Sequence, residues 1–221
     1  FLTLKLATSL DGRIATASGD SQWITGPKTR AYVHELRATH DAVMVGAGTA
    51  RADDPLLTVR GPSVVQQPVR IVVSRKLDLP LESNLVATIG DAPLWLLHGK
   101  DAPDDVRTQW TKRGAKLIEV PLNGRQLDIQ ALMQALGKEG LTRVFCEGGG
   151  DLAASLLSAD VVNALELHMG GVVIGAEGRP ALGVLGLDRL ADAPTFALEH
   201  VRQIGDDVVQ SWARQRRHTA E

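Results

Sequence analysis

Residues 143–157 read Arg-Val-Phe-Cys-Glu-Gly-Gly-Gly-Asp-Leu-Ala-Ala-Ser-Leu-Leu and give the clearest indication of the fold class. The first five residues form an apolar run typical of a buried strand, and the leucines after the glycines recur at helical spacing. Three glycines between a strand and a helix leave free backbone amides at a helix N-terminus, where anions bind. A packing turn seldom needs three glycines, so the stretch favours a phosphate site over a simple turn.

The same alternation of strand and helix continues on both sides of this stretch. Further apolar runs predict strands at residues 2–6, 41–45, 69–73, 93–97 and 116–120. Helical patterns begin at Pro27 and Pro103 and cover residues 127–136. Strands separated by helices predict an α/β fold, with a mostly parallel central sheet that helices flank on both faces.

The last third of the chain has a different pattern, which predicts an antiparallel C-terminal extension of the sheet. Residues 164–174, 195–204 and 207–212 look extended, and the last two segments predict a hairpin around Gly205-Asp206. No Pro/Gly/Ser-rich linker divides the chain, so we expect one domain over residues 1–213. A charged tail is expected over residues 214–221.

The composition limits the classes of function. The chain has 221 residues, of which 44% are hydrophobic and 23% charged, as in an average globular domain. A formal net charge of −2 gives no basic field for nucleic acid, and no run of 18 apolar residues could span a membrane. The single cysteine, Cys146, excludes an intramolecular disulfide and a multi-cysteine zinc site, and we expect it in the core. One thiol suits a reducing compartment, so we expect a cytoplasmic protein without a metal site.

Residues that follow the predicted strands are the first candidates for a site, because ligands of parallel sheets bind at the carboxyl ends of the strands. Gly46 and Gly48 allow backbone to approach a phosphate, although Arg51 stands where the dinucleotide fingerprint has a third glycine. A ligand loop and an ordinary turn both remain open there. Glu147 ends an apolar strand, and its carboxylate either contacts a ligand or acts as a structural cap at the end of that strand.

Several charged side chains have a functional and a structural interpretation. Ser74 and Arg75 follow a strand and suit the 2′-phosphate of NADP, unless Arg75 is merely solvated. Arg37 and Arg60 could hold a second phosphate by forked hydrogen bonds, although exposed arginines are usually surface residues. If Lys5 points inward from its strand, it is partnered and a candidate functional residue. If it lies on the exposed face of the strand, it gives no indication of function.

Other candidates lie in loops and on a helix. Trp23 sits in a glycine-rich loop, which is an unusual place for core packing, and it is suited to cover a ring. Asp53 and Asp54 either form a turn or cap a helix. His34 and His40 are expected on a helix surface or seam.

Four motifs together resemble a known family. They are Lys-Leu-Ala-Thr-Ser-Leu-Asp-Gly-Arg at residues 5–13, Ser-Gln-Trp-Ile-Thr at 21–25, Thr-Ala-Arg-Ala-Asp-Asp-Pro-Leu-Leu-Thr-Val-Arg at 49–60 and Glu-Gly-Gly at 147–149. In this order and spacing they resemble the reductase domain of the bacterial bifunctional riboflavin biosynthesis deaminase/reductase, over residues 1 to about 210. The resemblance implies a dihydrofolate reductase-like fold and NADPH-dependent reduction of 5-amino-6-(5-phosphoribosylamino)uracil.

The resemblance also assigns roles to residues. It implies NADP contacts from Ala7, Trp23, Thr49, Asp53, Ser74, Gly149, Gly150, Asp151, Leu152 and Ser155. It implies substrate contacts from Ser21, Arg37, Leu57, Arg60 and Glu147. For catalysis we expect Asp53 near the reacting carbon, with Lys5 and Glu147 orienting the ribose hydroxyls or the pyrimidine while a hydride reaches C1′ of the ring-opened imine.

Partners and alternatives follow from the same resemblance. It implies a homodimer, for which the strand-rich C-terminus is a candidate interface, and a deaminase domain upstream of Phe1. It favours the uracil over the aminated pyrimidinone as substrate. Two other functions stay open: a pteridine or dihydrofolate reductase on the same fold, and a non-catalytic nucleotide-binding module.

Overall fold

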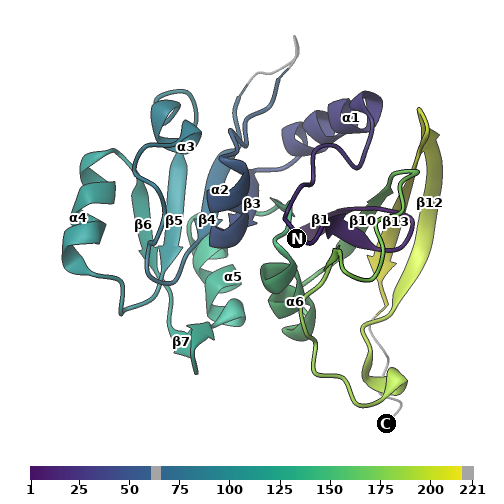
Figure 1. Cartoon of the computed structure of the whole chain (residues 1–221). Helices are drawn as coiled ribbons and strands as arrows, with labels where there is room; N and C mark the ends of the chain where they lie inside the picture. Colours follow the sequence, from purple (N-terminus) through teal and green to yellow (C-terminus); the bar gives the residue numbers. More distant parts are fainter. Residues whose placement is uncertain (61–65, 216–221) are drawn as a thin grey trace.

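A nine-stranded sheet forms the centre of the computed structural model, which describes residues 1–60 and 66–215 (Figure 1). The strand order is β12-β13-β10-β1-β9-β3-β4-β5-β6. Strands β10 to β6 of that order run parallel, whereas β13 pairs antiparallel with β10 and with β12. The bounds are Leu2–Thr8 (β1), Ala42–Gly46 (β3), Val69–Val73 (β4), Leu94–His98 (β5), Lys116–Glu119 (β6), Val144–Cys146 (β9), Ala164–Met169 (β10), Phe196–Ile204 (β12) and Asp207–Arg214 (β13).

Helices cover both faces of this sheet. Two of them, α5 (Ile129–Lys138) and α6 (Gly150–Ser158), pack on one face. The other face carries α1 (Pro27–Ala38), α2 (Ala47–Asp53), α3 (Asn84–Ala87) and α4 (Asp104–Lys112). Short strands form two separate ribbons, namely β2 (Arg13–Ala15) with β11 (Arg179–Pro180) and β7 (Leu122–Asn123) with β8 (Gln126–Leu127). One 3₁₀ turn, η1, spans Leu190–Asp192.

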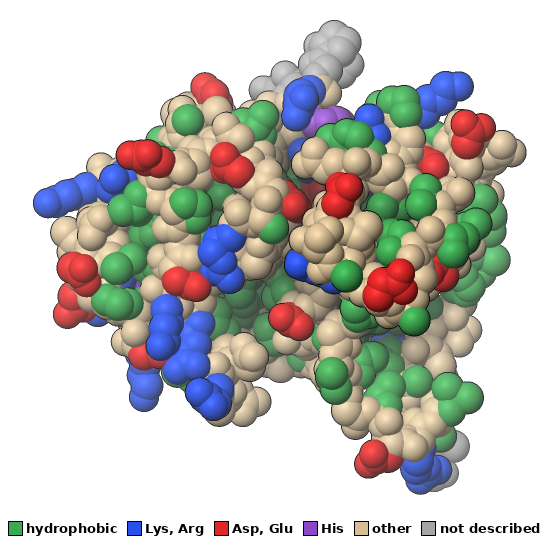
Figure 2. All heavy atoms as spheres, in the orientation of Figure 1, with side chains coloured by type: hydrophobic (Ala, Val, Ile, Leu, Met, Phe, Trp, Pro, Cys, Tyr) green, Lys and Arg blue, Asp and Glu red, His purple; other side chains and the backbone are tan. Residues whose placement is uncertain are grey.

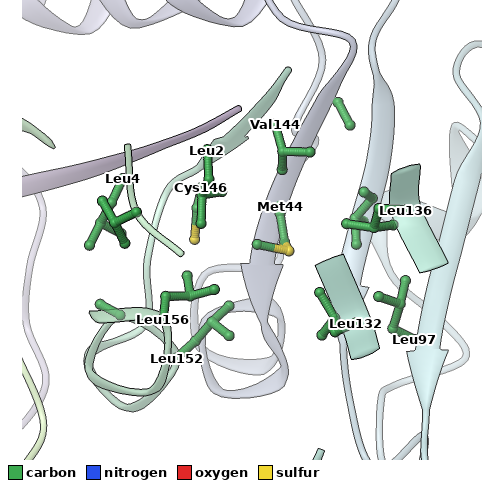
Figure 3. Packing of buried hydrophobic residues seen from close by; sticks show 14 of the residues in the cluster. Leu2, Leu4, Met44, Leu97, Leu132, Leu136, Val144, Cys146, Leu152 and Leu156 are labelled. Atoms are coloured by element: carbon green, nitrogen blue, oxygen red, sulfur yellow. The ribbon is translucent and has the colours of Figure 1, made fainter. Parts of the chain in front are cut away.

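The alternation of side chains along each strand sorts the core into two layers. Leu2 and Leu4 of β1 point to the face of α5 and α6, where they lie over Leu152 and Leu156 of α6 (Figure 3). Leu132 of α5 packs on the same face beside Leu97 of β5. Cys146 lies in this layer, and its burial raises the pKa of the thiol to about 12. The complete burial of the side chain confirms that Cys146 is a core residue.

The contact between α1 and the sheet is polar. Thr3 Oγ1 lies 3.0 Å from His40 Nε2, and the Tyr32 ring stacks on the buried His168 ring with centroids 5.9 Å apart. Val33 is the one buried apolar side chain among the described residues of this helix. Hydrogen-bonding groups thus position α1 over β1 and β10, and they place its C-terminal half beside the ends of the strands.

The predicted strands of the parallel sheet, the helix start at Pro27 and the hairpin at Gly205-Asp206 are confirmed. The second predicted helix begins at Asp104, with Pro103 as its N-cap residue. The helix predicted from residue 127 begins at Ile129 instead, because the Asp128 side chain caps it by accepting from the Ala131 N–H at 3.0 Å. Residues 47–53, interpreted as a loop or turn, form α2.

Two differences concern the C-terminal third. Strand β10 ends at Met169, well short of residue 174, and at the next residue, Gly170, the backbone lies close against that of Ile24. Strand β13 includes Arg214, the first residue of the expected tail, whose Nε donates to Asp160 Oδ1 at 2.7 Å. Residues 216–221 of that tail lie outside the described residues.

Candidate active site

A cleft of about 1190 Å³ runs along the carboxyl ends of β1, β9, β3 and β4. Figure 2 shows the surface hollowed between α2 and α6, which belong to opposite faces of the sheet. The position agrees with the rule that α/β sheets bind ligands at the carboxyl ends of their strands. It is also the edge of the sheet at which the sequence predicts the site residues.

The cleft brings together nearly all the residues that the resemblance assigned. Its walls include Lys5, Ala7, Ser21, Trp23, Arg37, Thr49, Asp53, Arg60, Ser74, Glu147, Gly149, Gly150, Asp151, Leu152 and Ser155. Leu57 is the exception, since its side chain is 2% exposed and packs with Val43 and Val45 in the core. The backbone at Leu57 has a φ of 55°, a left-handed turn that directs the side chain inward. The Leu57 side chain therefore does not line the cleft, and the expected contact of Leu57 with substrate stays a prediction.

A glycine cradle forms where β9 meets α6. Gly148 and Gly149 have φ values of 92° and 93°, a backbone conformation that residues other than glycine rarely adopt. A Cβ at Gly149 would lie 3.0 Å from Thr49 Oγ1, so the two loops approach each other closely. No described side chain caps α6, which leaves the amides of its first turn available to an anion. These features fit the phosphates of a dinucleotide cofactor.

Lys5 and Asp53 both line the cleft, and each shifts the pKa of the other. Burial lowers the pKa of Lys5, which Glu147 and Asp53 partly restore. Partial desolvation raises the pKa of Asp53, against the opposing effect of Lys5. Lys5 forms no ion pair with any residue that the structure describes. An amine with a lowered pKa beside a carboxyl with a raised one is an arrangement suited to proton transfer.

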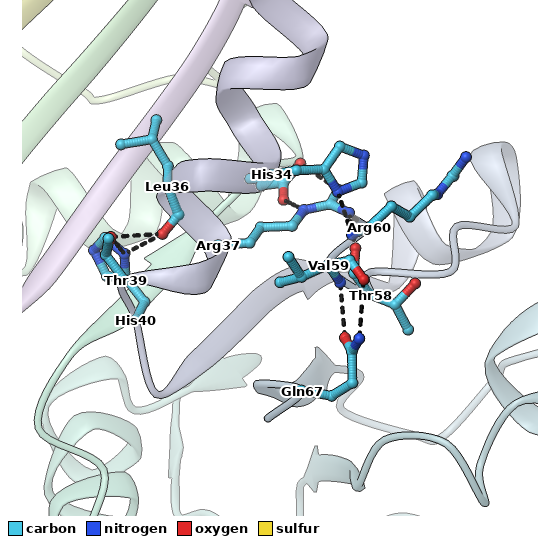
Figure 4. A network of polar contacts seen from close by, with 10 residues as sticks. His34, Leu36, Arg37, Thr39, His40, Thr58, Val59, Arg60 and Gln67 are labelled. Carbon is cyan, nitrogen blue, oxygen red and sulfur yellow. Dashed lines mark hydrogen bonds and ion pairs between the residues drawn. The ribbon is translucent and has the colours of Figure 1, made fainter. Parts of the chain in front are cut away.

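Glu147 is held through a forked ion pair by Arg37, whose side chain extends from α1 in Figure 4. Arg37 Nε donates to Oε1 and Nη2 donates to Oε2 at 3.0 Å, while Nη1 donates to the Thr58 carbonyl at 2.8 Å. The two side chains are only 13% and 12% exposed. Burial alone would raise the pKa of Glu147, but Arg37 keeps it below the usual value. Glu147 is thus a fixed carboxylate in the wall of the cleft, with Arg37 as its structural partner.

His34 is a cleft residue whose position the sequence did not predict. It lies on α1 three residues before Arg37 and accepts a hydrogen bond at Nδ1 from the Arg60 N–H at 3.2 Å. Burial lowers its pKa, and the two arginines lower it further. Its spacing from Arg37 puts both on one helix face, the signal that could have identified it. His40 lies in the seam with β1, as expected.

The end of the cleft near β4 carries paired charges. Ser74 is buried and its Oγ donates to Asp78 Oδ1 at 3.0 Å. Arg75 donates from Nη2 to Asp101 Oδ2 at 2.6 Å and from Nη1 to the Arg125 carbonyl at 2.6 Å. Arg75 is therefore neither free nor simply solvated, and a phosphate at this end would meet a cation already oriented by a carboxylate.

Trp23 lies at the open side of the cleft. Its side chain is 65% exposed, and the Arg30 guanidinium sits 4.4 Å from its ring centroid. The exposed indole is suited to cover a flat ligand, as expected from its loop position. Within residues 1–60 and 66–215 there is no cluster of metal-ligating side chains, and no helix is long and apolar enough to cross a bilayer.

A model of the RibD C-terminal domain matches residues 1–210. The chain belongs to this family. RibD, the riboflavin biosynthesis protein of Escherichia coli (strain K12), is 34% identical over 224 aligned residues, which cover 94% of this chain and 58% of that protein. The chain therefore spans little more than half the length of this RibD relative.

Solved structures agree with the family assignment. The Thermotoga maritima deaminase/5-amino-6-(5-phosphoribosylamino)uracil reductase is 26% identical with a TM-score of 0.78, covering 97% of this chain and 56% of that one. Dihydrofolate reductase of Enterococcus faecalis shares the fold alone, with a TM-score of 0.53 at 12% identity over 98% of this chain and 97% of that one. The predicted dihydrofolate reductase-like fold and the resemblance are confirmed. RibD C-terminal domains form a family of riboflavin-biosynthesis reductases, which use a nicotinamide cofactor.

Proposed function

We propose that this chain reduces 5-amino-6-(5-phosphoribosylamino)uracil to its ribitylamino product with NADPH. The observation that carries the proposal is the convergence of Lys5, Asp53 and Glu147 in one cleft with the glycine cradle. Membership of the RibD C-terminal domain family supports the same chemistry. When bound, NADPH supplies the hydride.

The reaction also needs a proton. Opening of the ribose breaks the C1′–O4′ bond, forms a C1′=N bond and places a proton on O4′, after which hydride addition at C1′ gives the amine. Lys5 and Asp53 are the groups suited to exchange this proton, because their pKa values are shifted toward each other. A carboxylate at Asp53 would also stabilise the positive charge of the protonated imine.

The remaining residues bind and orient. The first turn of α6 and the glycines before it would hold the pyrophosphate, and Trp23 would cover a ring. Ser74 and Arg75 would face the 2′-phosphate that distinguishes NADPH from NADH. Glu147, held in place by Arg37, would orient the ribose hydroxyls or the pyrimidine.

An absorbance assay tests the proposed function. NADPH consumption is expected with the uracil substrate, at a kcat/KM at least ~100-fold above that with dihydrofolate, and none is expected without an acceptor. Consumption with dihydrofolate alone would show that the substrate assignment is wrong. No consumption in any arm, with NADPH still binding, would indicate a nucleotide-binding module without catalysis.

We propose further that the chain forms a homodimer through β12 and that it acts beside a deaminase, as the name of the T. maritima protein pairs the two activities. Among the described strands β12 is an edge of the sheet, and it exposes Leu198 and Val201. Exposed apolar side chains on an edge strand favour pairing with another chain. Sedimentation at micromolar concentration is expected to give twice the chain mass, and Val201→Glu is expected to give monomer; a monomeric wild type would contradict the dimer.

A further inference from the structure

Arg30 is a cation in the wall of the cleft that the proposed function leaves without a role. It lies near the start of α1, and its guanidinium sits 4.4 Å from the centroid of the Trp23 ring. Its Nη1 donates to the Thr25 carbonyl at 2.6 Å, which holds the guanidinium beside the indole. Within residues 1–60 and 66–215, Arg30 forms no ion pair. It therefore places a fixed positive charge in the cleft wall that no described carboxylate pairs with.

The order of the strands indicates which end of a bound cofactor Arg30 would meet. Strands β4, β3, β9, β1 and β10 are consecutive neighbours, with Ser74 directly after β4 and the glycine cradle after β9. The loop that carries Trp23 lies farther along the same edge, because the Ile24 backbone lies against Gly170, the residue after β10. A cofactor with its 2′-phosphate at β4 and its pyrophosphate at the cradle would therefore extend its nicotinamide toward β1 and Trp23.

The two redox forms of this cofactor differ in charge at one ring. The nicotinamide is neutral in NADPH and carries one positive charge in NADP⁺, whereas the phosphates and the adenosine are the same in both forms. A cation in the cleft attracts these phosphates equally in both forms, so that this attraction cancels when the two affinities are compared. Only a charge near the nicotinamide changes their ratio, and inside a cleft solvent screens such a charge poorly.

Arg30 also changes what the Trp23 indole can attract. The negative face of an aromatic ring attracts a cation placed over it. On Trp23 the Arg30 guanidinium already occupies such a position, while 65% of the side chain remains exposed. A second cation over this indole, such as an oxidised nicotinamide, is repelled by the guanidinium, whereas a neutral ring can still stack there.

We propose that Arg30, held against Trp23, is a specificity-determining residue that disfavours NADP⁺ relative to NADPH. The proposal rests on the proposed function for the cofactor, but not for the uracil substrate. Hydride transfer moves two electrons and one proton from the nicotinamide to C1′ and leaves a positive charge on the ring. That charge arises at the end of the cleft that Arg30 occupies, so the oxidised cofactor is bound less tightly and is released for the next turnover.

The test compares the dissociation constants of NADPH and NADP⁺, measured by calorimetry, in wild type and in three variants. Arg30→Met removes the charge but keeps a long, unbranched side chain, and we expect it to lower the ratio of the NADP⁺ constant to the NADPH constant about 5-fold. Arg30→Lys keeps the charge and should leave the ratio within about 2-fold of wild type. Lys28→Met, which removes an exposed charge of α1 outside the cleft wall, is the matched control and should leave the ratio unchanged.

Each outcome has a distinct meaning. A lower ratio in Arg30→Met alone supports the proposal even if the chain fails to reduce the uracil substrate, which would overturn only the proposed function. An unchanged ratio in Arg30→Met contradicts the proposal, and equal weakening of both forms would show that Arg30 attracts the phosphates or supports the fold instead. An equally low ratio in Arg30→Lys would show that charge is not the cause and would overturn the proposal, as would the absence of binding of both forms to wild type.

Discussion

Asp53→Asn is expected to lower kcat by ~100-fold or more, with a smaller effect on KM, because the amide can neither exchange a proton nor carry negative charge. Asp53 lies at the end of α2 and lines the same cleft as Lys5. Burial raises the pKa of its carboxyl above the usual value, against the opposing charge of Lys5. Steady-state rates with saturating NADPH and uracil substrate measure the effect, and near-normal turnover would remove Asp53 from the mechanism.

The pH profile of this variant gives a second readout. Asp53 raises the pKa of Lys5 in the wild type, so replacing its charge lowers that pKa further. If protonated Lys5 is required, the alkaline limb of the kcat profile should move to lower pH in Asp53→Asn. A limb that stays in place would separate Lys5 from the titrating step.

Asp54→Asn is the matched control for this experiment. Asp54 Oδ1 accepts from the Asn84 N–H at 2.8 Å, and its carbonyl accepts from Asn84 Nδ2 at 2.8 Å. An asparagine at this position keeps an acceptor oxygen and tolerates the left-handed backbone, where φ is 40°. Near wild-type activity is therefore expected, which would show that the loss in Asp53→Asn does not come from a disturbed turn.

The fold was predictable because its signals are local. The apolar runs, the prolines at helix starts and the Gly205-Asp206 turn each specify an element within a few residues. The exceptions depend on contacts distant in the sequence. Strand β10 stops where Gly170 meets Ile24, and Leu127 pairs in β8 rather than opening α5.

The site was predictable only in outline, because most of its contacts join residues that are distant in the sequence. Its position followed from the ends of parallel strands, but the partners of each charge did not. In the sequence, Arg37 and Arg60 are equal candidates for binding a phosphate. Only the fold shows that Arg37 forms an ion pair with Glu147. The sequence around His34 predicts only a surface or seam residue. It does not reveal that the chain folds back and places the Arg60 N–H beside the His34 ring.

Gly170→Ala is expected to destabilise the protein by about 2–3 kcal/mol, the cost of forcing an added methyl group into a packed site. A Cβ at Gly170 would overlap the Ile24 carbonyl oxygen and lie 2.8 Å from its carbonyl carbon. Backbone cannot rotate away as a side chain can, so the chain itself must move. For a protein of this size the change should lower Tm by roughly 4–12 °C in a thermal melt.

Gly171→Ala is the control, because no atom lies within 4 Å of a Cβ at that position. The adjacent glycines therefore separate lost backbone flexibility, common to both variants, from the steric overlap that only Gly170→Ala introduces. The overlap also has a consequence for the cleft. Gly170 donates to the Thr8 carbonyl at 2.9 Å and packs against the Ile24 backbone, so it lies between the end of β1 and the loop that carries Trp23. Gly170→Ala should displace that loop and weaken NADPH binding at temperatures where the protein is still folded, whereas equal melting curves for the two variants would show that the backbone at Ile24 yields freely.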